Sequence, residues 1–149
     1  MPEPTPEFRE RLKTAWESIE VGQIYTFRRT FTEGDVTMFV GITGDYNPYH
    51  TDEAFAGESW FGRRIIPGLL TASMMTHIGG MLGFLAREMH FQFVLPVYIG
   101  DTITCTVTIL EKDAEKRLFF AEGSFVNQQG EEVLKATFNG FPAQVRLAK

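Results

Sequence analysis

The run PGLLTASMMTHIGGMLGFLARE, at residues 67–88, constrains the fold of this 149-residue chain more than any other stretch. Its apolar residues follow helical spacing but occupy nearly every side of the helix: Leu69, Leu70, Ala72, Met74, Met75, Ile78, Met81, Leu82 and Leu85. A helix that is apolar on all sides is normally a buried helix. Small residues such as Gly79 and Gly80 let other backbone segments come close to it. We therefore expect a long, buried central helix.

Four runs after this helix have the composition and alternation of β-strands, at residues 89–97, 102–111, 117–127 and 131–141. The run DTITCTVTIL, which starts at Asp101, alternates threonine with apolar residues, as in a sheet with one face in solvent. Gly100 and the pair Gln129-Gly130 mark turns. The run QIYTFRRTF predicts an earlier strand at residues 23–31. These elements predict an α+β fold in which a five-stranded antiparallel sheet wraps around the central helix.

Three shorter helices are expected before the central one, at residues 7–20, 33–42 and 51–56. Thr32 followed by Asp35 is a capping-box pattern for the second helix, and Gly44 is placed to end it. Thr51 is the expected N-cap of the third helix. Residues 1–20 are thus expected to form a partly helical N-terminal extension.

The composition favours a single cytoplasmic domain over residues 1–149. Apolar residues make up 44% of the chain, which is enough for a core, and the net charge of −5 argues against binding to nucleic acid or an anionic membrane. The N-terminus lacks the apolar segment of a secretory signal, and no apolar run reaches the ~18 residues of a membrane span. The one cysteine, Cys105, lies in a strand-like run and is expected to be a buried structural thiol.

The expected fold also predicts a partner. An all-apolar helix held by one small sheet leaves apolar surface uncovered, and an open sheet has two edges with unpaired backbone groups. Two copies that join their sheets edge to edge would cover both. We therefore expect a homodimer, which can assemble into a higher homo-oligomer.

A carboxylate and an imidazole stand five positions apart in the run TGDYNPYH, at Asp45 and His50. Pro48 lacks a backbone donor and disfavours helical geometry at Asn47, so the segment must turn. Residues five apart can converge in a turn, and a carboxylate and an imidazole that reach one water form an acid/base pair. The alternative from spacing alone is a plain Asx-turn loop in which Asp45 caps nearby amides.

The pair Pro67-Gly68 opens the central helix. Proline suits the first helical position, where a backbone amide would have no partner. The first free amide then belongs to Gly68, which has no side chain to block a ligand and lies at the positive end of the helix dipole. Such an amide can stabilise a carbonyl oxygen that gains negative charge. A plain helix start is the alternative interpretation.

The segments GDYNPYH, EAFA and RIIPGLLTASM, together with VLPVYIGDTITCTVTILEK, resemble the MaoC-like, (R)-specific enoyl-CoA hydratase family with the hot-dog fold. The similarity runs from about residue 21 to residue 141. The resemblance implies reversible syn addition of water to a trans-2-enoyl-CoA, which gives the (R)-3-hydroxyacyl-CoA. It implies no metal or redox cofactor, since the CoA thioester is itself the substrate.

The same resemblance implies the site residues. It places the catalytic aspartate at Asp45, the catalytic histidine at His50 and the oxyanion amide at Gly68, with Asn47 positioning the pair. The central helix of the family falls on residues 67 to about 85. Many members carry His-Gly where this chain has Pro-Gly, so any contribution from that histidine is absent here.

Residues outside the motif supply further candidates. Leu69 and Arg64 are additional substrate-binding candidates, Arg64 for the phosphates of CoA, with a solvated loop as the alternative for Arg64. His77, within the apolar helix, is expected to be a core or interface residue. The acidic residues around His50 match no standard metal-site spacing, so no metal site is expected.

The sequence leaves two alternatives to a hydratase open. One is a dehydratase of (R)-3-hydroxyacyl thioesters carried on CoA or on acyl carrier protein, because a catalyst accelerates both directions of a reaction. The other is a non-catalytic module that binds acyl-CoA, and the intact acid/base pair argues against it.

Overall fold

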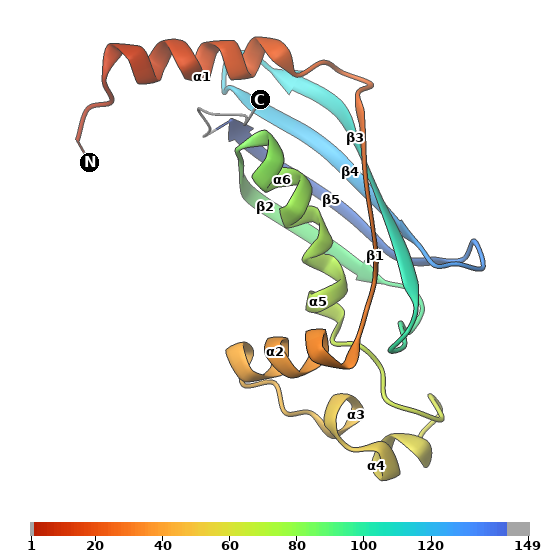
Figure 1. The fold of residues 1–149 in the computed structure, drawn as a ribbon. Coiled ribbons are helices and arrows are strands. Elements are labelled where there is room, and N and C mark those ends of the chain that lie inside the picture. The colour runs from red at the N-terminus through yellow and green to blue at the C-terminus, as the bar shows by residue number, and fades with distance from the viewer. Residues whose placement is uncertain (1, 143–149) are drawn as a thin grey trace.

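The computed structural model describes residues 2–142 (Figure 1). The strands are β1 Ile24–Thr30, β2 Phe84–Phe93, β3 Thr102–Asp113, β4 Leu118–Val126 and β5 Glu132–Pro142. The helices are α1 Pro6–Ser18, α2 Glu33–Thr43, α3 Pro48–Thr51, α4 Glu53–Gly57, α5 Gly68–Ala72 and α6 Met74–Leu82. All strand pairs are antiparallel and the sheet order is β1-β3-β4-β5-β2, so the expected five-stranded sheet is confirmed.

The sheet curves around α5 and α6, which run one after the other along its inner face (Figure 1). Helix α1 crosses one end of the sheet, and α2, α3 and α4 gather at the opposite end, near the start of α5. The loop between α2 and α3 and the N-terminus of α5 therefore lie at the same end of the molecule. Within residues 2–142, no helix has both the length and the apolarity needed to cross a membrane.

The core forms between α5–α6 and the inner face of the sheet. Alternate residues of β3, such as Cys105 and Val107, are fully buried, while the threonines between them are partly exposed. Met75 and Ile78 of α6 are each 3% exposed and belong to the same apolar core. Burial raises the pKa of the Cys105 thiol to about 12, as expected for a structural cysteine.

The central helix is shorter than expected at its C-terminal end. It ends at Leu82, where Gly83 adopts left-handed geometry (φ 58°), and the chain continues from Phe84 as β2. The expectations of a helix to residue 88, or to about residue 85, were wrong. Apolar residues after Gly83 suit a strand as well as a helix, and the left-handed turn, which glycine adopts at no steric cost, separates the two. The helix is also interrupted at Ser73, whose side chain makes no capping hydrogen bond to α6, so it consists of two segments, α5 and α6.

Strand β2 is correspondingly displaced from its expected position at residues 89–97. It starts at Phe84 and stops at Phe93. Residues 94–97 leave the sheet and pass the start of α5, where the Ile66 amide donates to the Val97 carbonyl (2.7 Å). This departure brings the segment after β2 to the end of the molecule that holds α2 and α3.

The central helix is buried against the sheet on one side and leaves apolar surface open on the other, as expected for a helix held by one small sheet. Leu69 and Met81 are more than half exposed, at 60% and 56%. On the neighbouring edge strand β2, Leu85 and Phe93 are similarly exposed, at 55% and 54%. One sheet cannot cover both sides of a helix, so this face stays apolar and open.

Helix α2 begins and ends as its sequence predicts. The Thr32 hydroxyl accepts from the Asp35 amide, and the Asp35 carboxylate accepts from the Thr32 amide (2.8 Å), which completes a capping box. Gly44 follows the helix in left-handed geometry (φ 72°). This ending directs the chain out of α2 and into the loop that carries Asp45.

The next helical segment differs from expectation. It consists of two short helices, because Pro48 starts α3 with Asn47 as its cap. Helix α4 is capped by Asp52, whose carboxylate accepts from the Phe55 amide (3.0 Å). Thr51 is therefore not an N-cap. It ends α3, and its hydroxyl donates to backbone carbonyls of the preceding turn.

Lys112 of β3 anchors α1 to the sheet. Its ammonium donates to the carbonyls of Trp16 and Ile19, both at 2.7 Å, and lies 4.8 Å above the Trp16 ring. The Trp16 ring itself stacks on Phe119, with 4.5 Å between ring centroids. Carbonyls at the end of a helix have no helical partner, and a cation there also interacts favourably with the helix dipole.

We predict that Lys112→Met lowers the free energy of unfolding by about 1.5–3 kcal/mol, the range for a lost hydrogen bond to a charged group. Urea denaturation followed by circular dichroism measures the change. Lys116→Met is the matched control, because the Lys116 side chain is 67% exposed and its surface ion pair with Asp113 should contribute little to stability. Equal effects of the two variants would contradict an anchoring role for Lys112.

Candidate active site

The loop between α2 and α3 brings Asp45 next to His50. The Asn47 amide approaches Asp45 Oδ1 (3.4 Å), and the Asn47 side-chain oxygen accepts from the Tyr49 amide (3.2 Å). Pro48 occupies the first position of α3, so the chain turns just before it. Asn47 therefore acts on both residues of the pair: its backbone holds Asp45, and its side chain starts the helix that carries His50.

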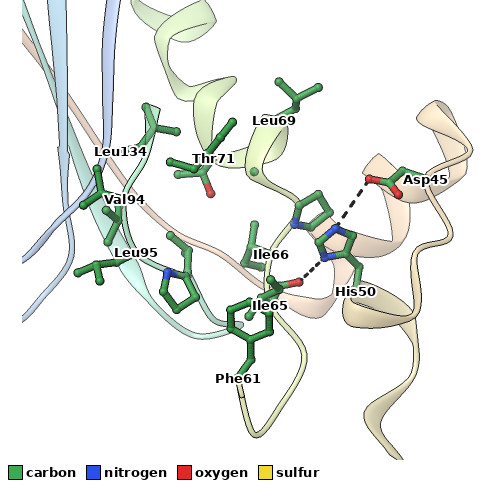
Figure 2. Close-up of a pocket in the computed structure, with 16 residues that line it drawn as sticks. Asp45, His50, Phe61, Ile65, Ile66, Leu69, Thr71, Val94, Leu95 and Leu134 are labelled. Carbon is green, nitrogen blue, oxygen red and sulfur yellow. Dashed lines mark hydrogen bonds and ion pairs between the residues drawn. The ribbon is translucent and has the colours of Figure 1, made fainter. Parts of the chain in front are cut away.

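Two contacts orient the His50 ring, as Figure 2 shows. Nδ1 lies 2.8 Å from the carbonyl oxygen of Ile65, and Nε2 lies 3.8 Å from Oδ2 of Asp45. A carbonyl only accepts hydrogen bonds, so we assign the proton to Nδ1, which leaves Nε2 of the neutral ring as an acceptor. The Ile65 amide donates to the Tyr49 carbonyl (3.0 Å), which fixes Ile65 relative to α3. The ring is nearly buried, and the Asp45 side chain is 46% exposed.

The Asp45 carboxylate and Nε2 of His50 are thus two acceptors that face each other across 3.8 Å. They cannot donate to one another in these forms. A water molecule has two O–H donors and can bond to both acceptors at once, leaving a lone pair of its oxygen free to react. The arrangement is therefore suited to hold and activate one water.

Gly68 is the first residue of α5, and Pro67 precedes it at the N-cap position, one residue earlier than expected. In the described part of the chain, the Gly68 amide has no hydrogen-bond acceptor. A side chain cannot be added here without rearrangement, because a Cβ on Gly68 would lie 2.6 Å from the Phe93 ring. Glycine lets this ring pack against the helix start while the amide remains a free donor at the positive end of the helix.

These groups line one cavity of about 490 Å³ (Figure 2). Asp45, His50 and Gly68 share it with a largely apolar lining: Phe61, Ile65, Ile66, Pro67, Leu69, Thr71, Phe93, Val94, Leu95, Pro96, Val97, Val133 and Leu134. A cavity of this size and character suits an organic ligand with an apolar portion and a few polar atoms. The three expected catalytic residues are therefore brought together, and their roles remain to be tested.

Arg64 is not a solvated loop residue, contrary to one expectation. Its guanidinium pairs with Glu33 at the start of α2 and with Glu53 at the start of α4, both at 2.7 Å, and also approaches the His50 carbonyl (3.4 Å). The hydrogen bonds to Glu33 and then to Glu53 raise the pKa of Arg64 above its usual range. The residue ties together the helices on either side of Asp45. Its expected contact with the phosphates of CoA stays a prediction.

Several cavity residues could not be identified from the sequence. Phe93, Val94 and Leu95 were expected inside a strand that continued to residue 97, and not in a cavity wall. A signal was present, because Pro96 is unsuited to the middle of a sheet and indicates that the strand ends before it. Leu69 lines the cavity and is 60% exposed, and its role in substrate binding also stays a prediction.

His77 lies outside this cavity. Its ring stacks on Phe27 of β1, with 3.8 Å between the ring centroids. The residue is exposed, so it is not a core histidine. The expected role at an interface stays a prediction. Among residues 2–142, no three side chains of His, Cys, Asp or Glu are grouped so that they could hold a metal ion.

Comparisons with known proteins agree on one family. The MaoC-like domain model matches residues 16–128. The (R)-specific enoyl-CoA hydratase of Aeromonas caviae is 31% identical over 129 residues, which cover 80% of this chain and 96% of that protein. A mitochondrial 3-hydroxyacyl-[acyl-carrier-protein] dehydratase of Solanum lycopersicum is 31% identical over 109 residues, which cover 70% of this chain and 64% of that protein.

The fold comparison points the same way. The structure of R-hydratase PhaJ1 from Pseudomonas aeruginosa matches with a TM-score of 0.80 at 26% identity, covering 90% of this chain and 91% of that one. The relatives are named as hydratases and dehydratases, enzymes that add water to a double bond or remove it. The chain therefore belongs to the MaoC-like dehydratase family, has the hot-dog fold, and is a hydro-lyase of the hydratase and dehydratase type.

Proposed function

We propose that the protein is an (R)-specific enoyl-CoA hydratase that reversibly converts a trans-2-enoyl-CoA into the (R)-3-hydroxyacyl-CoA. One observation carries the proposal: Asp45 Oδ2 and His50 Nε2 approach to 3.8 Å in a cavity that also contains the free Gly68 amide. The hydratase relative supports an enoyl-CoA substrate. The thioester needs no cofactor in this reaction, because its own carbonyl accepts the electrons.

Asp45 acts as the base in the hydration direction. It takes a proton from the bound water while the water oxygen forms a bond to C3 of the substrate. The electrons of the C2=C3 bond move toward C1, and the thioester oxygen gains negative charge. The Gly68 amide donates to that oxygen and stabilises the charge as it develops.

The proton on Asp45 then passes to C2, which restores the carboxylate and the thioester carbonyl. His50 accepts the second O–H of the water through Nε2 and so fixes the attacking oxygen. Because one carboxylate removes and returns the proton, the hydroxyl and the hydrogen add to the same face of the double bond. The apolar cavity accommodates the acyl chain and keeps bulk water from competing.

We predict that Asp45→Asn lowers kcat for hydration of crotonyl-CoA by about 10²–10⁴-fold, the usual contribution of a general base. The loss of enoyl absorbance measures the rate, and thermal unfolding verifies the fold. Asp52→Asn is the control, since Asn also caps helices and Asp52 caps α4 without lining the cavity. Near-normal activity of Asp45→Asn would rule out this mechanism.

A second candidate is a 3-hydroxyacyl dehydratase whose substrate is carried by acyl carrier protein. The dehydratase relative of Solanum lycopersicum favours it, and the same residues would catalyse it in reverse. A non-catalytic acyl-CoA module is disfavoured by the paired Asp45 and His50.

We predict that kcat/KM for crotonyl-CoA is at least as high as for crotonyl thioester on acyl carrier protein, since kcat/KM is the quantity that measures discrimination. Both are measured with the same purified enzyme and the same acyl group. An advantage of about tenfold or more for the carrier protein would replace the first candidate with the second.

We also propose that two copies associate through the open apolar face of α5–α6 and β2. This face gathers exposed apolar side chains next to a sheet edge, the arrangement that a second copy can cover. A cytoplasmic location remains a prediction from the sequence.

We predict that Met89→Glu, which places a charge on β2, shifts the protein from dimer to monomer in light scattering coupled to size exclusion. Met89 is 39% exposed. Val21→Glu, at a 58% exposed residue before β1, should leave the dimer intact. A wild-type monomer, or a dimer that tolerates Met89→Glu, would contradict the proposed interface.

A further inference from the structure

One buried hydroxyl in the cavity has no partner. Thr71, on α5, is 1% exposed, and its Oγ1 makes no hydrogen bond with any described residue. Buried polar groups are nearly always hydrogen-bonded, because leaving one unpaired destabilises the fold. The exception therefore needs a reason.

The helix itself satisfies comparable hydroxyls nearby. Ser73 donates to the Leu70 carbonyl and Thr76 donates to the Ser73 carbonyl, both at 2.6 Å. Thr71 makes no such bond. Figure 2 shows its oxygen directed toward the space between the helix and the segment that carries Val94 and Leu95. The oxygen is covered in the free protein, but Thr71 lines the cavity, so a rotation about its Cα–Cβ bond presents the hydroxyl to a molecule that enters.

The apolar surroundings of this hydroxyl let it distinguish between ligands with and without an oxygen atom on the chain. Of the sixteen residues that line the cavity, only Asp45, His50 and Thr71 have polar side chains. The first two form the acid/base pair, so Thr71 is the polar side chain left to contact the rest of a ligand. A plain alkyl chain would leave the hydroxyl unpaired, whereas an oxygen atom on the chain would satisfy it.

The helix geometry locates that oxygen. Thr71 follows Gly68 by three residues, about 4.5 Å along the helix axis, and helical side chains lean back toward the N-terminus. An extended chain advances about 3.3–3.6 Å for every three bonds. If C1 of the acyl group lies at the Gly68 amide and the chain extends along the axis of α5, the fourth or fifth carbon is level with the Thr71 hydroxyl.

We propose that Thr71 binds an oxygen atom on the fourth or fifth carbon of the acyl chain, so that the preferred substrates are oxygen-bearing acyl thioesters and not plain alkyl ones. This inference rests on the proposed function, because it takes Gly68 as the site of the thioester carbonyl. It narrows the substrate class of the cavity from any short acyl group to one with a ketone or hydroxyl.

Saturated thioesters test the inference without catalysis, since they have no double bond to hydrate. Isothermal titration calorimetry compares 4-oxopentanoyl-CoA with pentanoyl-CoA, and 5-oxohexanoyl-CoA with hexanoyl-CoA. We expect at least one oxo compound to bind about tenfold more tightly than its alkyl match, as for one well-placed hydrogen bond. Equal binding within both pairs, or no binding of any of the four, overturns the inference.

Three variants assign the preference to the hydroxyl. Thr71→Val keeps the shape of the side chain and should abolish the tighter binding of the oxo compounds. Thr71→Ser keeps the hydroxyl and should retain most of this preference. Ser73→Ala, which removes a hydroxyl already bonded to the helix, should leave the preference unchanged. A preference that survives in Thr71→Val contradicts the role of this residue.

Stability supplies an independent readout. Replacing an unpaired buried hydroxyl by a methyl group should keep or raise the melting temperature, so Thr71→Val should be at least as stable as the wild type. A clear drop in melting temperature would mean that the hydroxyl has a partner in the free protein, and would overturn the inference.

The two proposals can fail separately. If the protein prefers the oxo compounds in binding but hydrates no enoyl-CoA, only the proposed function is contradicted. If it hydrates crotonyl-CoA but shows no preference for the oxo compounds, only the Thr71 inference is contradicted.

Discussion

The hydrogen bond between Nδ1 of His50 and the Ile65 carbonyl is the interaction on which the chemistry of the site depends. It places the proton on Nδ1 and leaves Nε2 as an acceptor toward Asp45. Ile65 can fulfil this role because its own amide is bonded to Tyr49 of α3. The next residue, Ile66, is bonded to the segment after β2. The orientation of one imidazole is thus tied to three separate parts of the chain.

The remaining parts of the site are held by two different kinds of contact. Arg64 forms charge-assisted hydrogen bonds to Glu33 and Glu53 and so fixes the helices on both sides of the Asp45 loop. At the start of α5, Gly68 and Phe93 fit together because glycine has no side chain. Arg64 and Ile65 also belong to the segment that leads into α5, so the contacts that hold the loop also fix where the helix starts at the cavity.

The sequence predicts the parts of this structure that depend on local chemistry. The Thr32 capping box, the Gly44 helix end and the strict alternation in β3 each follow from residues close in sequence. The convergence of Asp45 and His50 follows from the turn that Pro48 imposes. The limits of α6 and β2 could not be predicted in the same way, since apolar residues on both sides of Gly83 suit either element and tertiary packing decides between them. The Arg64 pairs join residues 31 and 11 positions apart, which spacing alone does not reveal.

The central claim is that one water, held between Asp45 and His50, adds to an enoyl thioester from a single face. Hydration of crotonyl-CoA in D2O tests it most directly, with the configuration at C2 and C3 of the product determined by NMR. We predict the (R)-3-hydroxy product with deuterium at C2 on the same face as the new hydroxyl. An (S)-product, or deuterium on the opposite face, would contradict it.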